Sequence, residues 1–303
     1  MAEKFFKLGI IGWPLGYSLS PKMHTAALQA VGLADQYKYL EEPVESEKLE
    51  DWLGNKALEF HGFNVTMPHK EAVYEWMVRN PERASVEKVP EGLRAVNTVK
   101  LENGKLLGFN TDRQGFVGPL VKREGQDCLK GKRVLLLGAG GAAQAIAVNV
   151  VVYGATSLDI WNRNAQRAKS LAEEIKKSWG GSCKVSVRQS PEVLSDADLI
   201  VNATSSGMEA SDLLLIPEAS LEKRHWVYDI VYQPKETKLI QAARQRHCQV
   251  VVTGDEMLAH QGAEAFHVWF SDRLAPKFGS MWDVEIVKVM QKTLDDHFAE
   301  HRN

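Results

Sequence analysis

The stretch "VLLLGAGGAAQAI", residues 134–146, decides the fold of the second half of the chain. Its apolar start predicts a buried strand that runs into a glycine-rich turn and then into a helix. The spacing matches G-x-G-x-x-A, in which Gly138 permits the tight turn, Gly140 lets a pyrophosphate approach the backbone and Ala143 allows close helix packing. Free N–H groups at the helix N-terminus suit phosphates. The stretch therefore predicts a dinucleotide site, and the alternative is a glycine turn used only for packing.

The next predicted strand ends in "IWNRNAQRA", residues 160–168. A site for NAD usually has Asp or Glu at this point to bind the ribose hydroxyls. This chain has Asn162 and Arg163 instead, with Arg167 about one helical turn later. Two guanidinium groups suit a 2′-phosphate, so the sequence predicts NADP rather than NAD. Asp159 lies earlier in the strand and is expected to point away from the ribose, and the alternative for Arg167 is a solvated arginine on a helix surface.

Short apolar runs alternate with helix-like stretches along the 303 residues. This alternation predicts parallel sheets with right-handed crossovers. The stretch 94–112 differs, because two strand-like runs around an Asn-Gly pair predict a hairpin. Near the C-terminus, apolar residues at spacings of three and four predict an amphipathic helix: Val287, Met290, Leu294 and Phe298. The remaining expected elements are strands over 7–13, 37–44, 60–66, 157–162, 199–204, 226–232 and 248–254, and helices over 21–31 and 46–56.

We therefore predict an α/β protein built from two α/β domains that are separated by a cleft. The N-terminal, substrate-binding and catalytic domain is expected to comprise residues 1–112 and 255–303. A Rossmann-type domain that binds NADP is expected over residues 113–254. The boundary is placed after Asp112, where "TDRQGFVGPL" leads into a polar stretch before the second sheet begins.

The composition excludes several classes of function. Hydrophobic residues make up 44% of the chain and the net charge is −2, so we expect a globular protein without a basic field for nucleic acid. No apolar run approaches the roughly 20 residues that span a bilayer, and the N-terminus lacks the pattern of a signal peptide. Three isolated cysteines favour a reducing cytoplasm. The histidines show no metal-binding spacing, so no metal is expected, and the protein is predicted to be a monomer or homodimer that binds a small molecule.

The stretch "FNVTMPHKEAVYEW", residues 63–76, places a cation where a helix disfavours it. It predicts a strand end, a turn and a helix that opens at Pro68. Lys70 then lies in the first turn, where the helix dipole opposes a positive charge by about 0.3–1 kcal/mol. Such a loss of local stability is common at active sites, so Lys70 is a candidate functional residue. The alternative is a solvated lysine.

The stretch "GWPLGYSLSPKMH", residues 12–24, predicts an anion site. Ser20 is expected to be an N-cap before Pro21, and Ser18 would present its hydroxyl on the same side of an extended backbone. Two hydroxyls beside a helix N-terminus suit a carboxylate, although a cap and a turn would explain both serines equally well. Further along, Gln261 is a polar residue on an otherwise apolar helix stripe, where a polyhydroxylated ligand or a structural partner would satisfy it.

The order of the motifs resembles that of the shikimate dehydrogenase family over nearly the whole chain. The motifs are "GWPLGYSLSPKMH", "NVTMPHK", "AVNT", "GFNTD", "LGAGGAAQA", "NRNAQRA", "NATSSGM", "DIVYQP" and "LAHQGAEAF". The resemblance implies reduction of 3-dehydroshikimate to shikimate with NADPH, a step of aromatic amino acid biosynthesis. A related group, the quinate/shikimate dehydrogenases, also accepts quinate and can use NAD. A protein that kept the fold as a non-catalytic nucleotide-binding regulator is a further alternative.

The resemblance also implies roles for individual residues. Lys70 would be the acid in reduction and Asp112 its catalytic partner. The substrate carboxylate and hydroxyls would be bound by Ser18, Ser20, Thr66, Asn97, Tyr232 and Gln261. The cofactor would be bound by Gly138, Ala139, Gly140, Gly141, Ala142, Asn162, Arg163, Arg167, Thr204, Ser205, Met208 and Gly254. The chain departs from the family pattern at Tyr17, Thr25 and Asn164, where His, Asn and Thr or Ser are common, while Ser20 rather than Thr favours shikimate over quinate.

Overall fold

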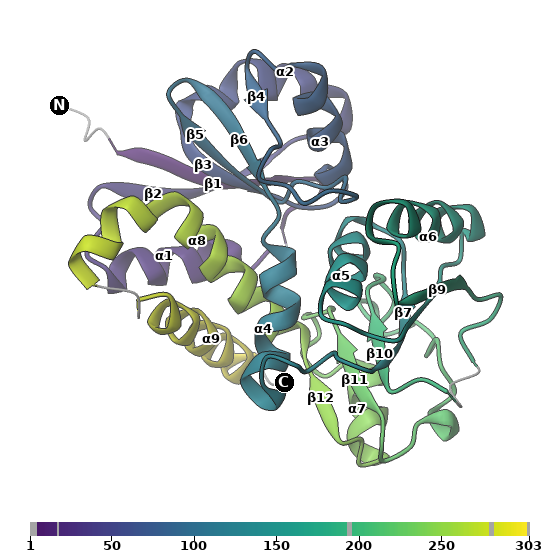
Figure 1. The fold of residues 1–303 in the computed structure, drawn as a ribbon. Helices are drawn as coiled ribbons and strands as arrows, with labels where there is room; N and C mark the ends of the chain where they lie inside the picture. The colour runs from purple at the N-terminus through teal and green to yellow at the C-terminus, as the bar shows by residue number, and fades with distance from the viewer. Residues whose placement is uncertain (1–4, 17, 193–195, 279–281, 302–303) are drawn as a thin grey trace. The chain divides into compact units, whose positions relative to one another are not determined.

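The computed structural model describes residues 5–16, 18–192, 196–278 and 282–301 (Figure 1). Tyr17, one of the departures from the family pattern, lies outside these ranges. The chain forms two compact units. Unit 1 comprises Met1–Pro90, Arg94–Thr111 and Ala259–Asn303, and unit 2 comprises Glu91–Leu93 and Asp112–Leu258.

Unit 1 is built on a mixed sheet of six strands. Its order is β2 (Tyr37–Pro43), β1 (Phe6–Gly12), β3 (Phe60–Val65), β5 (Thr98–Glu102), β6 (Lys105–Phe109) and β4 (Ala84–Ser85). β1 is parallel to both of its neighbours, but β5 is antiparallel to β3 and to β6. The expectation of a parallel sheet was therefore wrong for this unit. The reason is the predicted hairpin, in which Asn103 and Gly104 both have positive φ and return the chain without a crossover helix.

Helices cover both faces of this sheet (Figure 1). On one face lie α1 (Ser20–Ala30), α8 (Gly254–Phe278) and α9 (Trp282–Glu300), and on the other α2 (Leu49–Gly54) and α3 (Lys70–Arg79). The helix expected over 46–56 is divided into the short 3₁₀ turn η1 (Ser46–Lys48) and α2, and η2 (Lys56–Glu59) follows. α9 is amphipathic and buries Met290 and Leu294, as predicted, but the third buried residue is Ile286. The predicted Val287 and Phe298 are only half-buried.

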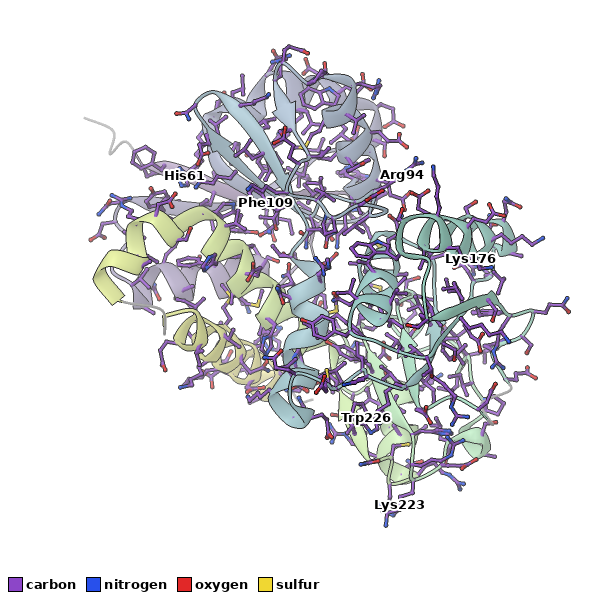
Figure 2. All side chains as sticks on the ribbon, in the orientation of Figure 1. His61, Arg94, Phe109, Lys176, Lys223 and Trp226 are labelled. Carbon is purple, nitrogen blue, oxygen red and sulfur yellow. The ribbon has the colours of Figure 1, made fainter. Side chains whose placement is uncertain are left out.

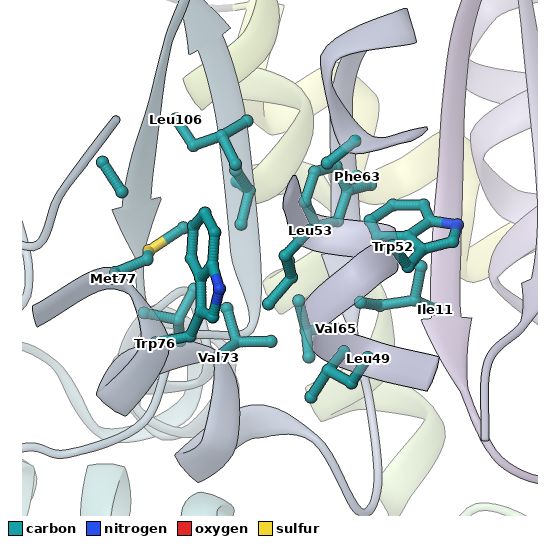
Figure 3. Close-up of a cluster of buried hydrophobic side chains, with 14 of the residues drawn as sticks. Ile11, Leu49, Trp52, Leu53, Phe63, Val65, Val73, Trp76, Met77 and Leu106 are labelled. Carbon is teal, nitrogen blue, oxygen red and sulfur yellow. The ribbon is translucent and has the colours of Figure 1, made fainter. Parts of the chain in front are cut away.

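The core on the α2 and α3 face is aromatic and aliphatic (Figure 3). The Trp52 ring meets the Phe63 ring edge-on, with centroids 4.9 Å apart. From α3, Val73, Trp76 and Met77 turn toward the sheet at spacings of three and four residues, as an amphipathic helix requires. This packing fixes the carboxyl ends of β1 and β3 and the start of α3 to one rigid base.

Unit 2 is a doubly wound fold with a fully parallel sheet. Its order is β12 (Val250–Val252), β11 (Trp226–Asp229), β10 (Leu199–Asn202), β7 (Arg133–Leu137), β8 (Ser157–Trp161) and β9 (Lys184–Val187). The strand order reverses between β7 and β10, and in such sheets ligands bind at the carboxyl ends beside that reversal. α5 (Gly141–Val152) and α6 (Ala165–Trp179) cover one face and α7 (Lys238–Gln245) the other; α4 (Asp112–Glu124) and η3 (Glu218–Ser220) complete the unit.

Side chains line both faces of the sheet of unit 2, and Trp226 is labelled on β11 in Figure 2. β10, β11 and β12 end earlier than the strands predicted over 199–204, 226–232 and 248–254. β12 stops because α8 begins at Gly254, and the other two stop because polar side chains capture the next backbone N–H groups. Asn202 accepts from the N–H of Thr204 at 3.1 Å, and Asp229 accepts from the N–H of Val231 at 3.0 Å. Within the described ranges, no helix combines the length and apolar character that crossing a membrane requires.

His24 of α1 gives the core of unit 1 a dependence on pH. Its ring is fully buried and stacks on that of Tyr39, with centroids 4.5 Å apart. Burial lowers the pKa of His24 to about 3, and the side chain of Asn64 opposes this shift only in part. The folded pKa therefore lies below the unfolded value of about 6.5. Because the unfolded chain takes up the proton first, stability is lost as the pH falls from about 6.5 to 3.

We predict that His24→Phe, which retains a ring against Tyr39, loses less stability in acid than the native protein. The difference in unfolding free energy between pH 7 and pH 3 should shrink by up to about 5 kcal/mol, the equivalent of the shift in pKa. Urea unfolding at a series of pH values measures this. His247→Asn, which changes an exposed histidine, should keep the native dependence; an unchanged acid dependence in His24→Phe would contradict the assignment.

Candidate functional site

In unit 1, the carboxyl ends of β1 and β3 come together at Gly12. A Cβ atom at Gly12 would clash with the side chains of Thr66 and Leu15 and would lie 3.0 Å from the carbonyl oxygen of Met67. The glycine therefore allows the two strand ends to approach. The N–H of Thr66 donates to the carbonyl of Ile11 at 2.9 Å, and the N–H of Trp13 donates to that of Met67 at 3.1 Å. The loops that carry Ser18 and Thr66 thus leave the sheet side by side.

Ser18 and Ser20 both lie at the N-terminus of α1, but their local geometry differs from the prediction. The helix begins at Ser20, and Leu19 has helical backbone angles rather than the expected extended ones. The cause is a side-chain turn, in which the Ser18 hydroxyl accepts from the Ser20 N–H at 3.3 Å. Ser20 was therefore wrongly expected to be the cap. Its side chain is buried and hydrogen bonds with Tyr39.

Lys70 is the first residue of α3, so the expected helix start at Pro68 was wrong by two residues. Pro68 instead lies in a turn that closes when the His69 N–H donates to the Thr66 carbonyl at 2.9 Å. The imidazole of His69 is buried, and its Nε2 lies 2.6 Å from the carbonyl oxygen of Val44. These contacts anchor the turn on both sides. Lys70 is half-buried in the first helical turn, where the cation was expected.

A buried polar network stands behind Lys70 in the same unit. The Lys70 carbonyl accepts from the Val96 N–H at 3.0 Å. The next residue, Asn97, is 2% exposed, and both ends of its amide contact Thr111. Its Oδ1 accepts from the Thr111 N–H at 2.8 Å and its Nδ2 donates to Oγ1 at 3.0 Å, while Oγ1 also lies 3.3 Å from Oδ1. The chain enters α4 directly afterwards, at the buried Asp112.

The start of α4 is fixed within unit 2 by a reciprocal contact. The side chain of Asn149, in the middle of α5, donates to the carbonyl of Arg113 at 2.6 Å. Arg113 Nε in turn donates to Asn149 Oδ1 at 3.1 Å. Burial lowers the pKa of Arg113, but not into a range where it would lose its charge. Asp112 therefore precedes a residue that is held from both its backbone and its side chain.

Gly138 and Gly140, in the turn after β7, are there for different reasons. Gly138 has a φ of +120°, and a Cβ there would lie 2.6 Å from the carbonyl oxygen of Ala203, so the fold itself requires it. Gly140 has an ordinary φ of −94°, and a Cβ there would meet nothing within 4 Å. α5 also begins without a side-chain cap. Open space beside uncapped helical N–H groups fits a pyrophosphate, so the residues present suit the predicted dinucleotide.

At the end of β8 the charges favour a phosphate. Asp159 faces β9, where its carboxylate accepts hydrogen bonds from Ser186 and from Arg188 Nε, the latter at 2.9 Å. The carboxylate is therefore already paired within the sheet. Asn164 caps α6 by accepting from two backbone N–H groups, at 3.0 and 3.2 Å. Arg163 and Arg167 are exposed beside this helix N-terminus, whose first turn has no acidic residue. The arrangement suits the 2′-phosphate of NADP.

After β10, the side chain of Asn202 organises the segment Thr204–Met208. It accepts from Thr204 and donates to the carbonyl of Ser206 at 3.0 Å. Ser205 is exposed, whereas Thr204 and Met208 are half-buried. A Cβ at Gly254 would clash with the carbonyls of Ile230 and Val231, so packing alone explains that glycine.

The predicted site residues fall in both units. Ser18, Ser20, Thr66, Lys70, Asn97 and Gln261 belong to unit 1, whereas Asp112, Tyr232 and the predicted cofactor residues belong to unit 2. Gln261 and Tyr232 are half-buried. In the part of the chain that the structure describes, no group of three or more His, Cys, Asp or Glu side chains is placed to hold a metal ion. Sequence reasoning missed Asn202 and Asp229, whose only signal is a polar residue at the end of an apolar run.

The chain matches two family models in succession. Residues 10–99 match the shikimate dehydrogenase substrate binding domain, and residues 120–224 match the model described as shikimate / quinate 5-dehydrogenase. A shikimate dehydrogenase (NADP(+)) of Rubrobacter xylanophilus is 42% identical over 278 residues, which are 90% of this chain and 93% of that protein.

Two solved structures resemble the chain over nearly its full length. One is shikimate 5-dehydrogenase from Thermus thermophilus in complex with NADP(H) and shikimate, with 33% identity, a TM-score of 0.77, and coverage of 96% of this chain and 99% of that one. The other is quinate dehydrogenase from Corynebacterium glutamicum in complex with NAD, with 32% identity, a TM-score of 0.77 and the same coverage.

The two glycines predict opposite outcomes for the same substitution. Gly140→Ser should fold with a free energy of unfolding within about 0.5 kcal/mol of native, because serine is a good N-cap and has space there. Its dissociation constant for NADPH should rise at least about tenfold, since the new Cβ occupies the approach of the pyrophosphate. Gly138→Ser should lose about 1–3 kcal/mol of stability through backbone strain.

Chemical denaturation and titration of NADPH fluorescence measure the two effects. The control is built into the pair, since Gly138→Ser tests the fold and Gly140→Ser tests the ligand. Unchanged NADPH binding in a folded Gly140→Ser variant would show that the turn serves packing alone.

Proposed function

Because the chain belongs to the shikimate dehydrogenase family, we propose that it catalyses the reversible, NADPH-dependent reduction of 3-dehydroshikimate to shikimate. The observation that carries the proposal is the match of both halves, in order, to the two domain models of one family. The family resemblance and the two-domain α/β fold that the sequence predicted are confirmed by the same matches.

The proposed substrate site uses hydroxyl and amide groups for a polyhydroxylated acid. Ser18 and Ser20 would bind the carboxylate at the N-terminus of α1, where the helix dipole favours a negative charge. The ring hydroxyls would be bound by Thr66, Asn97, Tyr232 and Gln261. The two ends of the Asn97 amide already contact Thr111, which supports a fixed orientation for its carboxamide.

The proposed cofactor site follows the carboxyl edge of the sheet of unit 2. The pyrophosphate would lie on Gly138–Ala142 and the adenosine end against Asn162, Arg163 and Arg167. The nicotinamide end would lie near Thr204, Ser205, Met208 and Gly254. When bound, the nicotinamide supplies the hydride that this reaction requires.

Proton transfer is the part of the reaction that the chain itself would perform. Lys70 would donate a proton to the carbonyl oxygen as negative charge develops there, and its ammonium would stabilise that charge. In the reverse direction it would accept the proton. Asp112 would hydrogen-bond the same hydroxyl and orient the lysine. The dipole of α3 opposes the lysine charge by about 0.3–1 kcal/mol, a small cost beside the gain in the transition state.

The compartment, oligomeric state and partners of the enzyme are proposed as well. We infer a cytoplasmic enzyme that acts as a monomer or homodimer on a small molecule, without nucleic acid or membrane partners. Its cysteines, Cys128, Cys183 and Cys248, are unpaired, which supports a reducing compartment. A broader quinate/shikimate dehydrogenase that uses NAD is the second candidate. It is favoured by Asn164, which stands where Thr or Ser is common in the family and whose side chain is occupied as a helix cap.

We predict that Lys70→Met lowers kcat by about 10²-fold or more, because both the proton donor and the stabilising charge are lost. KM for shikimate should change less than about threefold, since the carboxylate and hydroxyl contacts remain. Steady-state kinetics in both directions measure the split. Lys48→Met, which changes an exposed lysine of the same unit, is the matched control. Native turnover in Lys70→Met would exclude the lysine from proton transfer.

Oxidation of shikimate and quinate, each with NADP⁺ and NAD⁺, tests substrate and cofactor together. Shikimate with NADP⁺ should give the highest kcat/KM, and NADP⁺ should exceed NAD⁺ at least about tenfold because two guanidinium groups would contact the 2′-phosphate. Arg163→Gln should reduce that ratio. Comparable rates with quinate and NAD⁺ would favour the broader dehydrogenase, and no turnover with any pair would favour a regulator without catalytic activity.

A further inference from the structure

The carboxylate of Asp229, at the end of β11, is fully buried and serves three donors. Oδ1 accepts from the Asn202 side chain at 2.9 Å and from the Val231 N–H at 3.0 Å. Oδ2 accepts from the Thr237 hydroxyl at 2.7 Å. A buried carboxylate with this many partners holds the segments that supply them, because leaving any one donor unpaired is costly.

The first segment that Asp229 holds is Thr204–Met208, and it does so through Asn202. Since Asp229 accepts from the nitrogen of the Asn202 amide, the amide oxygen must face Thr204, whose N–H and hydroxyl both donate to it. The Thr204 hydroxyl in turn accepts from the Ser206 N–H at 3.0 Å. The orientation of one amide therefore sets the conformation of the segment that the proposed function places at the nicotinamide end of the cofactor.

The second segment is Val231–Tyr232, which contains a proposed substrate contact. Its backbone leaves the sheet at Val231, whose N–H donates to the Asp229 carboxylate. The Ile230 N–H donates to the Asn202 carbonyl at 3.0 Å. Thr237, held on the other oxygen of Asp229, caps α7 by accepting from the Ile240 N–H at 3.2 Å. The stretch between Asp229 and α7 is therefore fixed at both ends.

We propose that Asp229 is a positioning residue that sets the cofactor segment Thr204–Met208 and the substrate residue Tyr232 in one joint arrangement. The proposal rests on the proposed function, since both segments matter only if they contact the ligands. It assigns to Asp229 no contact with a reacting atom. Its consequence is that the ionised carboxylate couples affinity for the cofactor to affinity for the substrate.

The electrostatic setting gives this arrangement a pH dependence. Burial raises the pKa of Asp229 to about 6, although its three donors oppose the shift. Asp212 and Lys238 line the cavity beside it, and the Lys238 ammonium donates to the Asp212 carbonyl at 2.8 Å. Arg244 on α7 pairs with Glu236. The adjacent strands β10 and β12 carry no charged residue. As the pH falls through 6, a protonated Asp229 becomes a donor and loses acceptor capacity.

Asp229→Asn tests the proposal, because the amide has the shape of the carboxylate but no charge. Dissociation constants for NADPH are measured by fluorescence at pH 7.5 and 5.5. Those for 2′,5′-ADP are measured at the same two pH values, because this ligand carries only the effect of titrating the 2′-phosphate itself, whose pKa is about 6. In the native protein NADPH affinity should fall three- to tenfold more than 2′,5′-ADP affinity. In Asp229→Asn this excess should vanish, and at pH 7.5 both NADPH affinity and KM for shikimate should be impaired about threefold or more.

Asp212→Asn is the matched control. Asp212 accepts from the N–H groups of Gly207 and Glu209 in the same loop but, among the contacts of the described residues, none joins it to the Val231 segment. The Asp212→Asn variant should therefore have an altered NADPH affinity and an unchanged KM for shikimate. Native affinities in Asp229→Asn, or an effect on the cofactor alone, would overturn the proposal. If the variant fails to fold, the absence of the excess pH effect in the native protein would also overturn it; absence of any NADPH binding would instead reject the proposed function.

Discussion

The hydrogen bonds between Asn97 and Thr111 are the constraint on which the proposed chemistry depends. Both residues are 2% exposed, so their contact is shielded from water and expensive to break. On one side, the residue before Asn97 holds the backbone of Lys70; on the other, Asp112 follows Thr111 directly. A single buried amide thereby fixes the backbone of unit 1 beside Lys70 and at Thr111, the last residue before Asp112.

Unit 2 uses the same physical device at its own strand ends. Asn202 and Asp229 capture backbone N–H groups that would otherwise extend their strands, and they are joined to each other at 2.9 Å. A strand that ends on a buried polar side chain turns at a defined residue, because no water competes for the bond. In unit 1 the amide of Asn97 similarly takes the Thr111 N–H two residues after β6 ends.

The sequence was most informative where structure depends on neighbouring residues. The glycine turn after residue 137, the Asn-Gly hairpin and the amphipathic C-terminal helix were all predicted correctly, since each is encoded within a few positions. Errors arose where a distant or side-chain contact decides the outcome. Ser18 displaces the expected cap by bending the backbone, and the partners of Asp229 include one that lies 27 residues away. Such pairs have no period or spacing in the sequence.

Glycines show how a structure can separate the needs of the fold from those of a ligand. Gly138 has a positive φ, and a Cβ there would clash with the carbonyl of Ala203; a Cβ at Gly254 would clash with two carbonyls, so the chain accounts for both glycines. Neither its φ nor its neighbours account for Gly140, and an unexplained glycine beside uncapped N–H groups points to something outside the chain. Lys70 follows the same logic, because the helix dipole disfavours it where it stands. A residue that costs local stability, or that local stability leaves unexplained, is therefore a candidate for contact with a bound molecule.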